Sequence, residues 1–216
     1  RYDDVLGAFR DKVNYLNGGT RNDLVKQLQT SDGDTHRGLR SGVFPRTGAS
    51  VTAPFEPLVE ETVADVLDTV GEAGGCELAQ AVALQIPKRV VPVFIGFPDH
   101  LTDRLLTLVD PLAGYDPVDP VFPGPDLADE LIALVDEMIR YKCDNPGEDV
   151  ISHLIALEQV GELEPGGTAL IVRSFSFAAF DTTVNLIANG TVLLADNPDQ
   201  RQKLIDNPEL IPRAVE

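Results

Sequence analysis

The sequence predicts a mainly α-helical fold, and three observations lead to that prediction. Apolar residues recur three and four positions apart along most of the 216 residues, which is the spacing of an amphipathic helix. The run 168–195 contains no proline and is rich in Leu, Ile, Val, Phe and Ala, so it predicts one long buried helix of about 40 Å at about 1.5 Å per residue. Two glycines, Gly166 and Gly167, mark the approach to the start of this helix. Strands are expected only at the two ends of the chain.

The helices follow one another with short connections. Gly74 and Gly75 precede a helix start, and Asp99 stands at another. The expected helices span 3–11, 35–43, 54–73, 77–85, 87–95 (with a kink at Pro92), 100–109, 127–141, 150–160, 168–195 and 198–206, and a last one starts near Ile211.

Composition indicates a soluble protein of the cytoplasm with one sizeable core. The hydrophobic content is 43%, no apolar run opens the chain, and two cysteines give no disulfide framework. The long helix carries Arg173, Asp181, Asn185 and Asn189, too many polar groups for a lipid-facing span. A net charge of −18 argues against nucleic acid or an anionic membrane surface as partner.

Two segments lack helical periodicity. The stretch 111–125 holds five prolines and two glycines. A linker between domains is one interpretation, but amphipathic helices of one fold flank the stretch, so a lid loop is favoured and 1–216 is expected to form a single domain. The loop 13–31 is the other such segment.

The chemistry-bearing pattern is Ala178-Ala179-Phe180-Asp181-Thr182-Thr183, an acid and two hydroxyls within an apolar helix. Phe175, Ala178, Ala179, Thr182 and Leu186 share one face by helical spacing. Thr182 can bond back to the carbonyl of Ala178, and for Asp-Thr-Thr alone such a satisfied polar kink is the favoured interpretation. If that carbonyl is free, the two alanines allow something flat to approach the backbone.

A second pattern places His36 and Arg40 four residues apart at the start of a helix. Residues at this spacing share a helix face, and an imidazole beside a guanidinium suits carboxylate recognition. On spacing alone, an ordinary solvated pair is the favoured interpretation.

Together the two patterns resemble the cytochrome P450 family of haem-thiolate monooxygenases. Residues 178–183 resemble the distal-helix signature, with Ala179 where the family usually has glycine, and 36–40 resemble the family's His-x-x-x-Arg. Weaker resemblances follow in family order over nearly the whole chain, at 1–5, 95–98, 145–150 and 197–212. The resemblance implies the mainly α cytochrome P450 fold, present in part.

The axial cysteine loop of that family has no counterpart in this sequence. Cys76 and Cys143 lack a second ligand at metal-binding spacing, and His100 and His153 are expected to be ordinary imidazoles. The chain also lacks an initiator methionine and stops before the family's Glu-x-x-Arg pair. These features suggest the central portion of a longer protein, with the axial cysteine outside this chain.

The resemblance implies roles for individual residues. His36 and Arg40 would hold the propionates of haem b, and Ala178 and Ala179 would lie against the haem. Phe175 and Ala178 would face a hydrophobic substrate. Asp181 and Thr182 would manage the protons that dioxygen activation requires. An electron-donor protein such as ferredoxin would be the partner.

Three functions remain open. The favoured one is a monooxygenase that acts on a hydrophobic small molecule, such as an intermediate of natural-product metabolism. The second is a haem-free P450-like homologue that serves as partner or activator of another enzyme. The third is an unrelated helical binding module. A closed network of buried hydrogen bonds around Asp181 would support this third interpretation.

Overall fold

The computed structural model describes the chain except for residues 12, 16–27, 29–30, 110–124 and 216. The expected lid loop and most of the loop 13–31 therefore lie outside the described residues. The helices are α1 (Tyr2–Arg10), α2 (Gly33–Val43), α3 (Ala49–Thr52), α4 (Glu56–Ala73), α5 (Gln85–Ile95), α6 (Asp99–Val109), α7 (Pro125–Asp144), α8 (Val150–Gln159), α9 (Gly167–Asp196), α10 (Pro198–Asp206) and α11 (Ile211–Val215). Short 3₁₀ turns are η3 (Phe44–Arg46), η4 (Ala53–Phe55) and η7 (Pro208–Leu210), and η5 (Ala79–Ala83) is π-helical. No strand occurs among these described elements.

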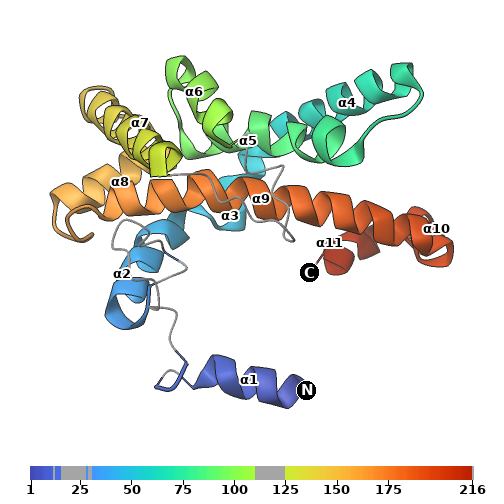
Figure 1. The fold of residues 1–216 in the computed structure, drawn as a ribbon, viewed down its shortest axis with the longest axis horizontal. Helices are drawn as coiled ribbons and strands as arrows, with labels where there is room; N and C mark the ends of the chain where they lie inside the picture. The colour runs from blue at the N-terminus through green and yellow to red at the C-terminus, as the bar shows by residue number, and fades with distance from the viewer. Residues whose placement is uncertain (12, 16–27, 29–30, 110–124, 216) are drawn as a thin grey trace.

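Helix α9 runs along the whole long axis of the molecule (Figure 1). The helices α4 to α7 lie on one side of α9, and α2 lies on the other side. Contacts from α5, α6, α7 and α8 all reach α9, and α2 packs against both α8 and α9. Helix α9 is therefore the element through which the two sides of the molecule are joined.

The main core lies between the N-terminal half of α9 and the helices α5 to α8. Phe180 is 2% exposed and Ile171 is fully buried, and both point into this core. A smaller cluster joins Val184 of α9 to Ala83 and Leu84. Beyond Val184 the apolar side chains of α9 are largely uncovered, and with α10 and α11 they line an open apolar groove of about 710 Å³.

Helix ends are set by local chemistry that the sequence displays. Gly74 and Gly96 adopt left-handed conformations at the C-terminal ends of α4 and α5, where a side chain would be strained. The Asp149 carboxylate accepts a hydrogen bond from the Ser152 amide and so caps α8. The carboxylate of Glu158 accepts from the amides of Gly166 and Thr168 at the start of α9.

The helical prediction is confirmed, with boundaries mostly within two residues. Helix α5 continues through Pro92. The expected α-helix at 77–85 is wrong in type, because the amide of Leu84 bonds to the carbonyl of Ala79 and widens the turn to π geometry. The expected helix at 54–73 begins instead as η4, and the short helix α3 was not predicted.

By length and composition, α9 is the one described helix that could cross a membrane. A core helix of a soluble protein has the same composition, and one wall of the main core is formed by this helix. This single helix is weak support for a membrane span.

Candidate active site

The central turns of α9 present small and polar groups on a partly exposed face. Asp181 and Thr182 are exposed, and Ala178 and Ala179 are half-buried. Phe180 and Val184 occupy the opposite face and pack inward. The expectation of a helix buried as a whole is therefore wrong for this face, because apolar side chains occur on both faces of α9 and only one face packs.

The Thr182 hydroxyl bonds back to its own helix. Its Oγ1 donates to the carbonyl oxygen of Ala178 at 2.6 Å. The alternative of a free Ala178 carbonyl is thus not the arrangement in this structure. A hydroxyl has one proton and two lone pairs, so Thr182 can still accept a hydrogen bond on the exposed side. To donate outward, its O–H must rotate away from Ala178.

Asp181 has one described partner, and that partner comes from the same helix. Its Oδ1 accepts a hydrogen bond of 3.1 Å from the side-chain amide of Asn185, one turn further along. Both side chains are exposed. This open pair does not form the closed, buried network that an unrelated helical module would need. The remaining carboxylate oxygen is available to water, so the group can exchange protons with solvent.

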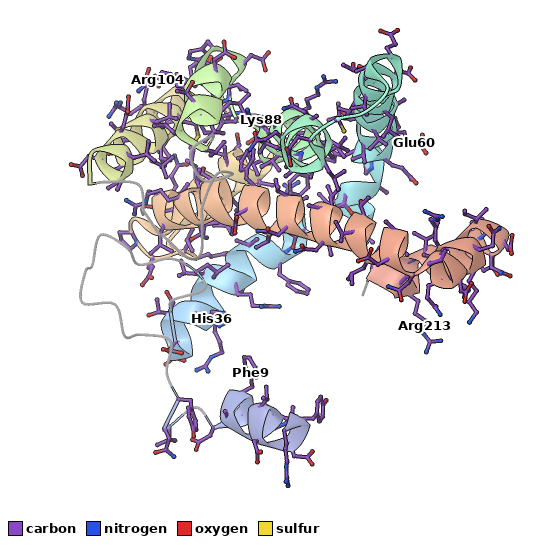
Figure 2. The ribbon with its side chains drawn as sticks, turned by 45° about the vertical axis from the view of Figure 1, so that its right-hand side comes forward. Phe9, His36, Glu60, Lys88, Arg104 and Arg213 are labelled. Carbon is purple, nitrogen blue, oxygen red and sulfur yellow. The ribbon has the colours of Figure 1, made fainter. Side chains whose placement is uncertain are left out.

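Helix α2 carries the second predicted pair, and Figure 2 labels its first member, His36. His36 is half-buried and Arg40 is exposed, with its guanidinium carbon 5.7 Å from the centroid of the Phe44 ring. Leu39 and Val43 beside them are buried and pack α2 into the main core. Two cationic or hydrogen-bonding groups on one outward face can bind carboxylates.

The structure keeps the two predicted pairs on separate helices. Within the described part of the chain, no hydrogen bond or ion pair joins His36 or Arg40 to Asp181 or Thr182. Phe175, the predicted substrate contact, is half-buried and packs against the main core. Sequence reasoning missed Asn185 as the partner of Asp181, although its spacing of four residues was a usable signal.

The remaining candidate ligands do not assemble into a centre. Cys76 and Cys143 are exposed free thiols, and no three His, Cys, Asp or Glu side chains among the described residues are grouped to hold a metal ion. His100 lies edge-on to Tyr141 with ring centroids 4.8 Å apart. Burial and the nearby Arg46 lower the pKa of His153, although a hydrogen bond with the Gly42 backbone and the charge of Glu162 oppose that shift.

A scan of the sequence against protein-family models finds no match. Comparison with single proteins is more informative. The 6-deoxyerythronolide B hydroxylase of Saccharopolyspora erythraea is 27% identical over 198 residues, which are 91% of this chain and 49% of that protein. The biotin biosynthesis cytochrome P450 of Bacillus subtilis is 31% identical over 189 residues, which are 84% of this chain and 47% of that protein.

A solved structure agrees with these relatives. The crystal structure of P450BioI in complex with a fatty-acid-ligated acyl carrier protein superposes with a TM-score of 0.76 and 26% identity, over 88% of this chain and 50% of that one. The chain belongs to the cytochrome P450 family. It is of the bacterial type and spans about half the length of the P450 relatives it matches.

The residues of this P450 chain fit the cofactor that P450 proteins carry. Ala178 and Ala179 are half-buried and have no atom beyond Cβ, so this strip of α9 allows a flat group to approach the backbone. His36 and Arg40 supply the nitrogen donors that haem propionates need. The donor set and the open strip are consistent with haem binding, although they lie on different helices.

Proposed function

We propose that the protein containing this chain is a haem-dependent monooxygenase that inserts one oxygen atom from O₂ into a hydrophobic small molecule of secondary metabolism. The observation that carries the proposal is the open face of α9, where Asp181 and Thr182 are exposed beside the small Ala178 and Ala179. The hydroxylase name of one relative supports an oxygen-inserting reaction.

We assign cofactor binding to both sides of the molecule. The side chains of His36 and Arg40 hold the propionates of haem b, and Ala178 and Ala179 form the surface against which the ring lies. When bound, the haem supplies the reduction of O₂ and the transfer of one oxygen atom to the substrate. Its axial cysteine is proposed to lie outside these 216 residues. Phe175 and Ala178 border the substrate.

Asp181 and Thr182 control protons. The exposed Thr182 oxygen accepts a hydrogen bond from a water, and rotation of its O–H away from Ala178 lets the hydroxyl donate in turn. Asp181 accepts from Asn185 on one oxygen and exchanges protons with solvent through the other. The two residues together pass protons along the exposed face, one at a time.

The residue-level test is Thr182→Ala, with Thr191→Ala as a matched control. Thr191 lies on the same helix, is exposed, and donates the same back-bond, at 2.7 Å, to Ile187. Thr182→Ala should keep its haem content and divert electrons to hydrogen peroxide, whereas Thr191→Ala should couple normally. Normal coupling in both variants would remove Thr182 from the proton path.

The cofactor test is the visible spectrum of the intact protein, reduced and exposed to carbon monoxide. A strongly red-shifted, thiolate-type Soret band is expected. The double variant His36→Ala with Arg40→Ala should contain less haem than wild type. A wild-type protein without any Soret band would mean the haem-free homologue and would cancel these assignments.

We further propose that a cytoplasmic electron-donor protein such as a ferredoxin reduces the enzyme. The net charge of −18 disfavours nucleic acid and anionic membranes as alternative partners.

A further inference from the structure

Ser174 on α9 is hydrogen-bonded to a segment far away in the sequence, and its neighbouring residues do not predict this bond. Its side chain is 4% exposed. Its Oγ accepts a hydrogen bond of 2.9 Å from the backbone amide of Leu28, 146 residues away in the sequence, and donates one of 2.9 Å to the carbonyl of Leu170. One hydroxyl is therefore used as donor within the helix and as acceptor between distant segments.

Leu28 is fixed by more than this bond. Its side chain packs against the main core, and its carbonyl accepts a bond of 3.4 Å from the amide of Ser31. Asp32, the residue before α2, then accepts from the amide of His36 through its own carbonyl. The described residues Leu28, Ser31 and Asp32 thus lie between the Ser174 hydrogen bond and the helix that carries His36.

Ser174 also lies one helical turn before Ala178. Residues four apart share a helix face, so the anchor point for Leu28 adjoins the strip of α9 proposed to lie against the haem. The helices α2 and α9 are in direct contact as well. Displacement of Leu28 from Ser174 would shift the start of α2 relative to that strip.

We infer that Ser174 is a positioning residue that sets the His36 and Arg40 side of the cofactor site relative to the Ala178 and Thr182 side. The inference rests on the proposed haem site and goes beyond it by assigning a residue that contacts no reacting group. Ser174 acts through Leu28, by accepting the hydrogen bond of a partly buried backbone amide.

The chain offers a matched control two residues away. Ser176 is fully buried on the same helix and donates the same back-bond, at 2.9 Å, to Val172. Among the described residues it has no partner outside α9. Ser174→Ala and Ser176→Ala therefore remove the same hydroxyl from the same helix, and only the first leaves a distant amide without its acceptor.

The experiment measures two quantities on the full-length haem-loaded protein. Hydrogen exchange of the peptide containing Leu28 reports the anchor, and transfer of haem to excess apomyoglobin reports cofactor retention. Ser174→Ala should speed both, with haem lost about fivefold to tenfold faster, the lower part of the range for an unsatisfied amide, because the Leu28 amide is only partly buried. Ser176→Ala should match wild type, and Ser174→Thr, which keeps a hydroxyl, should restore much of the protection.

Each other outcome is decisive. Faster exchange at Leu28 with wild-type haem retention would overturn the positioning role and leave a merely structural bond. Equal effects in Ser174→Ala and Ser176→Ala would also overturn it, since the helix alone would then explain them. If Ser174→Ala does not fold, Ser174→Cys, a poor acceptor of similar size, replaces it with the same expected results. A wild-type protein that takes up no haem would refute the proposed function itself.

Discussion

Lys142→Met should destabilise the protein strongly, because it breaks a nearly buried ion pair. The Lys142 Nζ lies 2.7 Å from Asp149 Oδ2, and the two side chains are only 11% and 16% exposed. Methionine keeps most of the length of the lysine side chain, so the change removes the charge more than the packing. Asp149 would then hold a negative charge, largely out of water, without its cation.

The magnitude follows from what Asp149 retains. Breaking a buried pair by removing one partner costs about 3–5 kcal/mol. Asp149 keeps hydrogen bonds from the amide of Ser152 at 2.8 Å and from its hydroxyl at 3.2 Å. Because these two bonds still stabilise the carboxylate, the expected loss lies near the lower end, at about 3 kcal/mol.

A surface pair provides the control. Arg104 Nη1 lies 2.6 Å from Glu137 Oε2, but these side chains are 47% and 45% exposed. Arg104→Met should cost no more than about 1 kcal/mol. Urea unfolding of both variants measures the losses, provided that the slopes of the transitions stay equal. Equal losses in the two variants would refute the reasoning that burial gives the Lys142 pair its larger effect.

Three further predictions concern stability in the same urea assay. Gly96→Ala should lower the free energy of unfolding clearly more than Gly74→Ala. Both glycines have positive φ, but of the two only Gly96 would place a new Cβ against another atom, 2.2 Å from Asp149 Cβ. Equal losses in the two variants would contradict this. The pKa of His153 is lowered in the native protein, so as the pH falls through about 6.5 the unfolded chain binds the proton first and wild type loses stability. His153→Leu should remove this loss. Burial raises the pKa of Glu158, but hydrogen bonds from the backbone amides of Gly166 and Thr168 act against burial, and the native pKa is lowered. Glu158→Gln should therefore remove a loss of stability that appears only below about pH 4.5. An unchanged pH profile in the Glu158 or the His153 variant would refute the assignment of that residue.

Periodicity predicted the helices well because it depends on local spacing. The helix expected at 198–206 has the same bounds in the structure. Pro198 at its first position, Asn197 before it and Asn207 after its end are strong local signals. The π-helical Ala79–Ala83 was missed, because its apolar residues are equally compatible with α geometry and the widened turn depends on packing against α9.

The orientation of α9 could not be predicted in the same way. The sequence places Ala178 and Thr182 on one face and Phe180 and Val184 on another, but both faces contain apolar residues. Which face packs depends on α5 to α8, whose positions the sequence does not reveal. The apolar run therefore predicted a helix buried as a whole, whereas Asp181 is exposed.

The two serines of α9 show where local reasoning ends. Ser174 and Ser176 are both buried, and both donate to the carbonyl four residues earlier. Ser174 follows Arg173 and Ser176 stands between two phenylalanines, but neither neighbourhood indicates a partner from another segment. Ser174 differs because its oxygen accepts a hydrogen bond from Leu28, 146 residues away, and only the tertiary fold brings these two residues together. The hydrogen bond on which the proposed role of Ser174 rests is therefore visible in the structure alone, whereas Asp181 and Thr182 were proposed from the sequence because of their chemistry.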